Sequence, residues 1–161
     1  MSVLRSTQTI IAVCGAGHCD TDLTALAEAV GQKIAEANAM LICGGLGGVM
    51  AAACRGARLA NGVTVGVLPG ADRHAANPDV LIPIATNMGQ ARNVVIVQTA
   101  DVVIAIGGEY GTLSEIALAR KLGRAVIGLR SWALGDEHTI VADNPDEAIA
   151  LALQHALHHS S

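Results

Sequence analysis

The chain has 161 residues and a formal net charge of −4 at neutral pH. This length suits one domain with a sizeable core, and an apolar fraction of 52% excludes a disordered chain. With one Trp, one Tyr and no Phe, the chain lacks the aromatic side chains that stack on bases. Its negative charge is also unsuited to a phosphate backbone, so we expect no nucleic acid partner.

No apolar run approaches the ~20 residues of a membrane span, and the N-terminal sequence MSVLRSTQT has no apolar signal core. We therefore expect a soluble, cytoplasmic protein without a membrane partner. The four cysteines lack Cys-x-x-Cys spacing. Three of them stand in or beside apolar segments, where a thiol behaves as a small hydrophobic group. We expect no disulfide framework and no metal site.

Strand and helix patterns alternate along the chain. Seven apolar, often β-branched segments are predicted to be strands, at residues 9–13, 40–43, 63–68, 80–84, 102–106, 125–129 and 139–142. Apolar spacing and capping signals predict helices at about residues 21–38, 49–60, 112–122 and 145–157. Residues 87–98 are expected to form a fifth helix because they lie between two strands that look parallel. Asp20 or Thr21 is the expected cap of the first helix, and Asn144 that of the last. The longest loop in the first half covers residues 71–79.

Alternating strands and helices predict βαβ units and an α/β fold. We expect a single Rossmann-like domain over residues 1–161, with a mostly parallel sheet of six or seven strands and helices on both faces. The predicted strand order is 3-2-1-4-5-6. Ligands of such sheets bind beyond the carboxyl ends of the strands.

Three glycine-rich turns follow predicted strands, at residues 14–20 (CGAGHCD), 43–50 (CGGLGGVM) and 106–112 (IGGEYGT). A tight turn before a helix leaves backbone N–H groups unpaired, where they favour an anion. The first turn is not a dinucleotide fingerprint, because Asp20 replaces the third glycine, and no P-loop Gly-Lys-Ser/Thr follows any turn. The turns predict one site for a small anionic ligand.

GGLGGVM, ARN at residues 91–93 and GGEYGTLSEIALA at residues 107–119 resemble the LOG-like (lysine decarboxylase-like) superfamily of Rossmann-type proteins. That superfamily includes nucleoside 5′-monophosphate phosphoribohydrolases, which activate cytokinins, and molybdenum cofactor carrier proteins. The hydrolase pattern PGGxGTxxE would place a phosphate cradle on Gly108, Gly111 and Thr112. It would place the catalytic carboxylate on Glu115 and the catalytic arginine on Arg92.

The sequence departs from the hydrolase pattern in three places. Gly107 replaces the proline, Glu109 replaces the second glycine, and Asn93 replaces a lysine. These departures resemble the carrier branch, which implies that the chain binds, protects and carries the molybdenum cofactor. The cofactor has a terminal phosphate, a pterin and a metal held by a dithiolene. A carrier needs no catalytic residue, and molybdoenzymes would receive the cofactor. The alternative is a hydrolase of an AMP-like substrate that uses Arg92 and Glu115.

The turns and the resemblance together define the predicted cofactor-binding residues. They are Gly15, Gly17, Gly44, Gly45, Gly47, Gly48, Arg73, Thr86, Asn87, Met88, Arg92, Gly107, Gly108, Glu109, Gly111, Thr112 and Glu115. Arg73 and Arg92 are the candidate cations. Relatives in the superfamily are oligomers, so we also expect a homo-oligomer, either a dimer or a tetramer.

Several of these residues have a simpler interpretation. Thr112 and Glu115 have the spacing of a helix capping box, and Thr86 and Asn87 have side chains that cap helices. Arg92 near a helix start is either solvated or paired with an anion, and the helix dipole favours the anion.

Overall fold

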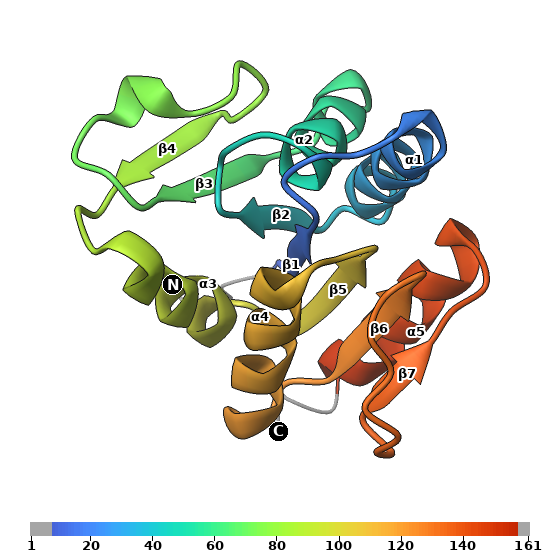
Figure 1. The fold of residues 1–161 in the computed structure, drawn as a ribbon. Coiled ribbons are helices and arrows are strands. Elements are labelled where there is room, and N and C mark those ends of the chain that lie inside the picture. Colours follow the sequence, from blue (N-terminus) through green and yellow to red (C-terminus); the bar gives the residue numbers. More distant parts are fainter. Residues whose placement is uncertain (1–7, 158–161) are drawn as a thin grey trace, which may run out of the picture.

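The computed structural model describes residues 8–157. Within this range, seven strands form one sheet in the order β4-β3-β2-β1-β5-β6-β7, and every neighbouring pair is parallel. The strands are β1 (Ile10–Gly15), β2 (Met40–Cys43), β3 (Thr64–Leu68), β4 (Ile82–Ala85), β5 (Val102–Ile106), β6 (Val126–Leu129) and β7 (Thr139–Val141). The sheet confirms the predicted α/β class (Figure 1). Residues 1–7, part of the segment predicted to lack a signal core, lie outside the described chain.

Within residues 8–157, four α-helices and two short 3₁₀ helices lie between strands, and a fifth α-helix follows β7. They are α1 (Thr21–Glu36), α2 (Val49–Leu59), η1 (Arg73–Ala75), η2 (Gly89–Ala91), α3 (Arg92–Thr99), α4 (Tyr110–Lys121) and α5 (Pro145–Leu157). The predicted caps of the first and last helices are confirmed. Asp20 Oδ1 accepts from Leu23 N at 2.8 Å, and Asn144 Oδ1 accepts from Glu147 N at 2.9 Å. Within residues 8–157, no helix combines the length and apolar character needed to cross a membrane.

The predicted strand order is wrong at the fourth strand. That order places the fourth strand beside the first, whereas β4 pairs with β3 at the sheet edge and β5 pairs with β1. The reason lies in the connections. β3 and β4 are joined by a loop that holds only η1, so consecutive strands stay neighbours. The crossover back to β1 is made later, by α3, and it places β5 against β1.

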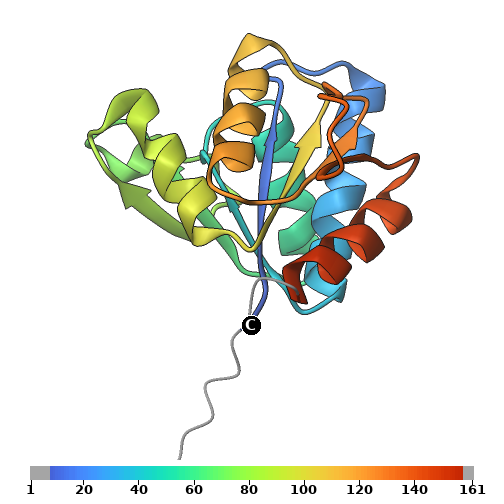
Figure 2. The ribbon, with the colours of Figure 1, turned by 90° about the horizontal axis from the view of Figure 1, so that it is seen from below.

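Helices cover both faces of the sheet, and each face has its own core (Figure 2). Helices α1, α2 and α5 pack together on one face, whereas α3 and α4 contact each other on the other. Alternate residues of β1 point to opposite faces, as strand geometry requires. Ile11 and Val13 belong to the first core, whereas Ala12 and Cys14 belong to the second.

Candidate ligand-binding site

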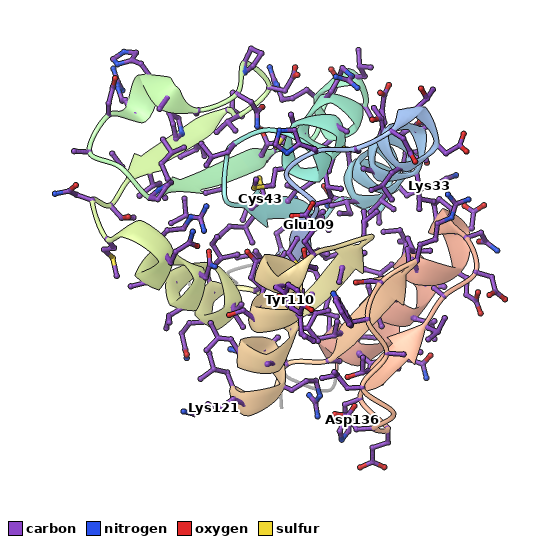
Figure 3. The ribbon with its side chains drawn as sticks, viewed as in Figure 1. Lys33, Cys43, Glu109, Tyr110, Lys121 and Asp136 are labelled. Carbon is purple, nitrogen blue, oxygen red and sulfur yellow. The ribbon has the colours of Figure 1, made fainter. Side chains whose placement is uncertain are left out.

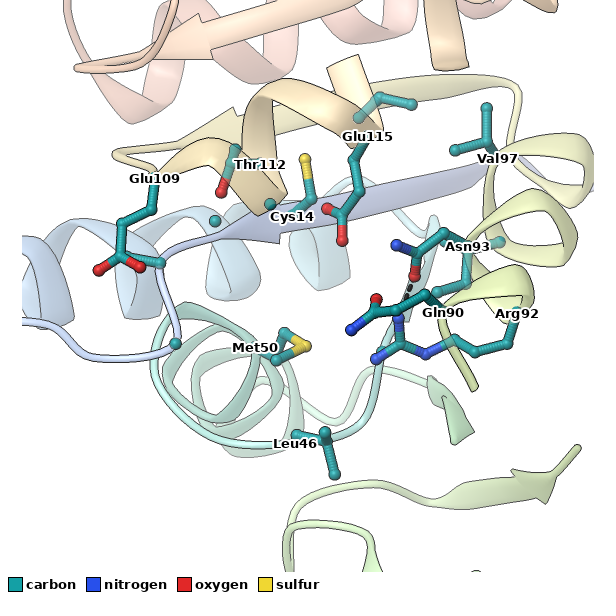
Figure 4. A pocket seen from close by; sticks show the side chains of 17 residues that line it. Cys14, Leu46, Met50, Gln90, Arg92, Asn93, Val97, Glu109, Thr112 and Glu115 are labelled. Atoms are coloured by element: carbon teal, nitrogen blue, oxygen red, sulfur yellow. Dashed lines mark hydrogen bonds between the residues drawn. The ribbon is translucent and has the colours of Figure 1, made fainter. Parts of the chain in front are cut away.

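A pocket of about 240 Å³ opens where β1, β2 and β5 end (Figure 4). Its walls come from the turns after these three strands, from the first turns of α2 and α4, and from one face of α3. The predicted convergence of the glycine-rich turns on one edge is therefore observed. This geometry follows from the parallel sheet, which brings the carboxyl ends of its central strands together.

The pocket brings together part of the predicted set. The predicted residues that line it are Gly15, Gly17, Gly44, Arg92, Glu109, Gly111, Thr112 and Glu115. Predicted residues that are not among its lining are Gly45, Gly47, Gly48, Arg73, Thr86, Asn87, Met88, Gly107 and Gly108. The five glycines of this second group belong to the same turns but do not face the cavity.

The remaining four residues of the second group lie between β3 and α3. Arg73 is exposed in η1, beyond the edge strand β4. Thr86 Oγ1 donates to Leu68 O at 2.6 Å and accepts from Met88 N at 3.2 Å. Asn87 has φ +54, which is unlike the extended backbone of a helix cap. The predicted capping by Thr86 and Asn87 is therefore wrong, because the chain makes a turn here and α3 begins at Arg92.

Sequence reasoning missed several residues that line the pocket. They are Cys14, Ala16, Leu46, Met50, Gln90, Asn93, Ile96, Val97 and Val103. The sequence does indicate that three of them share one face of a helix, because Asn93, Ile96 and Val97 are spaced by three and four residues in α3. That face could have been assigned to the pocket only with the correct strand order.

Arg92 is the buried cation of the pocket. Its residue is 5% exposed, Nη1 donates to Asn93 Oδ1, and Nε has no hydrogen-bond partner among the described residues. Within residues 8–157 no carboxylate forms an ion pair with it. Burial lowers the pKa of Arg92, while the charges of Glu115 and Cys43 raise it. A buried, incompletely paired guanidinium is costly, which favours an anionic ligand beside it.

Gly44 makes room for this guanidinium. A Cβ at Gly44 would lie 2.7 Å from Arg92 Nη2 and 2.9 Å from Met50 Sδ. Both distances are shorter than ordinary van der Waals contacts. The absence of a side chain at Gly44 therefore lets Arg92 lie against the turn after β2.

Glu115 adds a carboxylate to the same pocket. Burial raises its pKa, and a hydrogen bond from Cys14 and the charge of Arg92 partly offset that rise. Burial, and then the nearby Glu115, raise the pKa of the Cys14 thiol well above its ordinary value. The predicted capping box is wrong, because α4 begins at Tyr110 and Thr112 lies inside it, where it is buried. Glu115 is thus placed on the pocket side of α4 (Figure 4).

Two helices begin at the pocket without side-chain caps. Glu109 precedes α4 and Gly48 precedes α2, and neither side chain makes a capping hydrogen bond. The first N–H groups of a helix have no intrahelical acceptors. In α2 one of them is used within the protein, because Val49 N donates to Ala16 O at 3.0 Å. The others are suited to an anion.

The two charged ends of the pocket have opposite signs. Figure 4 places Glu109 at one end and Arg92 with Asn93 at the other. A carboxylate near the start of α4 complements the helix dipole itself and would repel a phosphate there. The arrangement therefore favours the anionic group of a ligand at the Arg92 end.

The fold and the pocket define a Rossmann-like protein whose site is built from strand-end turns around a buried arginine. A family model matches residues 8–158, and the chain belongs to the SLOG cluster4 family. An uncharacterized protein of Archaeoglobus fulgidus is 45% identical over 139 residues, covering 86% of this chain and 91% of the relative.

Two solved structures resemble the chain closely. The molybdenum cofactor binding protein of the phototrophic bacterium Rippkaea orientalis has a TM-score of 0.87 and 36% identity, covering 92% of this chain and 98% of its own. The molybdenum cofactor carrier protein of Chlamydomonas reinhardtii has a TM-score of 0.86 and 34% identity, covering 93% of this chain and 99% of its own. The resemblance to molybdenum cofactor carrier proteins that the sequence indicated is confirmed.

Proposed function

We propose that the protein binds, protects and carries the molybdenum cofactor in the pocket at the carboxyl ends of β1, β2 and β5. The observation that carries the proposal is Arg92, a buried guanidinium with an unpartnered Nε, which lines this pocket. It supplies the cation that a phosphorylated ligand requires. The likeness to a molybdenum cofactor binding protein over 92% of this chain supports the choice of ligand.

The proposal includes an orientation for the ligand. The terminal phosphate lies toward Arg92 and Asn93, at the end of the pocket away from Glu109. Apolar side chains of Ile96 and Val97 line the pocket and are suited to the carbon framework of the pterin. Binding then needs no covalent ligand, and the protein slows decay by excluding water and oxidant.

The test follows the cofactor in air. Free cofactor is mixed with the purified protein, and the ability of samples to reconstitute a cofactor-free molybdoenzyme is measured over time. Slower decay than with serum albumin supports the proposal. Arg92→Met should lose most of this protection, whereas Arg58→Met, at an exposed position on α2, should keep it. Equal decay with and without the wild-type protein refutes the proposal.

The same pocket also suits a second function, which is hydrolytic. Glu115 has a raised pKa and shares the pocket with Arg92, an arrangement that also suits the hydrolysis of a nucleoside 5′-monophosphate. Release of adenine from AMP is therefore measured on the same preparation. Adenine release by the wild type, abolished in Glu115→Gln, would replace the carrier proposal with the hydrolase.

We further propose that the single domain forms a homo-oligomer in the cytoplasm. Supporting this, β4 is an edge strand whose apolar side chains are exposed, at 46% for Ile82 and 43% for Ile84. Val94 and Val95 on the following helix are exposed as well. Exposed apolar edge strands favour association. Light scattering after size exclusion should give a dimer or tetramer for the wild type and a smaller species for Ile84→Asp.

A further inference from the structure

Two cysteines lie in contact behind one wall of the pocket. Cys43 ends β2 and Cys54 lies in α2, and their Sγ atoms are 3.6 Å apart. Both are fully buried free cysteines in the core on the α1–α2 face of the sheet. Figure 3 shows the Cys43 sulfur beside β2. Two sulfur atoms at this separation are a short movement away from the about 2.05 Å of a disulfide bond.

The two thiols are connected to the turn that forms the pocket wall. Gly45 N donates to Cys43 Sγ at 3.4 Å, and Gly45 O accepts from Asn77 N at 2.9 Å. Asn77 Nδ2 donates to Leu46 O at 2.9 Å, and the Asn77 side chain is also hydrogen-bonded to Cys54. Leu46 lines the pocket. A movement of either sulfur is therefore passed to residues 44–46.

The turn lies next to Arg92 on its pocket side. A Cβ at Gly44 would already approach Arg92 Nη2 to 2.7 Å, so the backbone at this position lies against the guanidinium. Forming a disulfide would bring the two sulfurs closer by about 1.5 Å, within a fully packed core. A displacement of this size at Cys43 changes the position of Gly44 relative to Arg92.

We propose that Cys43 and Cys54 are an oxidisable pair whose disulfide shifts residues 44–46 against Arg92 and loosens the hold of the pocket on its ligand. The effect on the ligand rests on the proposed function, whereas the disulfide and the shift of the turn do not. A hydroperoxide is the oxidant. The pair would couple an oxidising environment to the release of an oxygen-sensitive ligand.

The reaction has two steps. The Cys43 thiolate attacks one oxygen of hydrogen peroxide, the O–O bond breaks, and a sulfenic acid forms while the released hydroxide takes up the thiol proton as water. The Cys54 sulfur then attacks the Cys43 sulfur, and the sulfenic hydroxyl leaves with the Cys54 proton as a second water. Two thiols lose two electrons, and one peroxide is reduced to two waters.

The surroundings of the pair assign Cys43 as the attacking thiol. Gly45 N donates to Cys43 Sγ at 3.4 Å, and this hydrogen bond stabilises a thiolate at Cys43. The contact with Cys54 and the Gly45 N–H lower the pKa of Cys43 against the opposing effect of burial, whereas the contact with Cys43 and burial raise the pKa of Cys54. Burial means that peroxide reaches the pair only when the turn opens. Oxidation is therefore slow, and a bound ligand should slow it further.

The test begins with the reduced protein, which is treated with hydrogen peroxide, denatured, labelled with N-ethylmaleimide and digested with trypsin. Cys43 and Cys54 fall in one tryptic peptide, residues 34–55. We expect this peptide to lose both labels, to become lighter by two hydrogen atoms, and to recover with dithiothreitol. Cys19→Ser, which removes a partly exposed thiol, should behave in the same way. If peroxide oxidises Cys19 of the wild-type protein while the peptide with Cys43 and Cys54 still carries both labels, the proposal is overturned.

Amide hydrogen exchange of residues 44–48 and the ¹⁵N resonance of Arg92 Nε then report on the turn without any ligand. We expect at least threefold faster exchange and a shifted resonance in the disulfide form. We expect no peroxide effect in Cys43→Ser, which lacks the attacking thiol. An unchanged turn in fully oxidised protein refutes the switch.

Cofactor loss is measured on the same two forms. Loss should be at least threefold faster from the oxidised form. Equal loss from the two forms refutes the proposal that the disulfide loosens ligand binding. If neither form retains cofactor while the disulfide and the shifted turn are observed, the proposed function fails and the oxidisable pair stands.

Discussion

Replacing Gly44 with alanine tests whether the position of Arg92 decides ligand binding. The added Cβ would lie 2.7 Å from Arg92 Nη2, 3.1 Å from Arg92 Cζ and 2.9 Å from Met50 Sδ. Unstrained contacts are about 3.5–4.0 Å, so the guanidinium and the thioether must each move by about 1 Å. Both groups are ends of flexible side chains, which makes the movement inexpensive for the fold.

The expected stability change is small. Overpacking costs about 1–3 kcal/mol in a rigid core, and flexible neighbours favour the lower end of this range. Alanine also restricts the unfolded chain, which stabilises the protein by about 0.4–1 kcal/mol where the backbone is compatible. Gly44 does not have a positive φ. We therefore expect the free energy of unfolding of Gly44→Ala to lie within about 1 kcal/mol of the wild type.

The expected binding change is larger. A hydrogen bond to a charged group contributes about 1.5–3 kcal/mol, so displacing the guanidinium should weaken cofactor binding about ten- to a hundredfold. Urea unfolding and cofactor retention after gel filtration measure the two quantities.

Gly70→Ala is the matched control, because a Cβ there meets nothing within 4 Å and Gly70 also lacks a positive φ. If Gly44→Ala retained as much cofactor as the wild type, the assigned role of Arg92 in holding the ligand would be refuted. If Gly44→Ala lost well above 1 kcal/mol of stability, Arg92 and Met50 could not move away from the added Cβ.

Three further changes test other parts of the account. Glu115 has a raised pKa, so the pocket gains a negative charge as pH rises through that pKa, and retention of the anionic cofactor should weaken over this interval. Glu115→Gln should remove this pH dependence, and a variant with the pH profile of the wild type would contradict the role of Glu115. Arg92→Met removes a buried charge, so unfolding should require as much urea or more while cofactor retention is lost; strong destabilisation would contradict this. Asn144→Ala removes the cap of α5 and should cost about 1 kcal/mol in urea unfolding without changing retention, and an unchanged midpoint would argue against the cap.

Patterns of short range predicted the fold well. The β-branched runs and the glycine-rich turns located all seven strands and the edge where three turns meet. The strand order was not predictable in this way, because it depends on which connection crosses the sheet. Here the loop with η1 keeps β4 beside β3, and the crossover falls to α3.

The site was predicted in part for the same reason. Arg92 and Glu115 were identified through a motif resemblance, and both line the pocket. The spacing of Thr112 and Glu115 fits a capping box, but the helix start at Tyr110 makes that reading wrong. Cys14 has an apolar strand around it in the sequence, and only the parallel sheet places it beside Glu115.

The most direct test of the central claim is to count bound cofactor. The protein is incubated with molybdenum cofactor without oxygen and separated by gel filtration, and the pterin is oxidised to its fluorescent product and quantified. The account predicts about one pterin per chain for the wild type and almost none for Arg92→Met, if one buried arginine holds one phosphate. Pterin that does not elute with the wild type, or that elutes equally with Arg92→Met, would contradict the account.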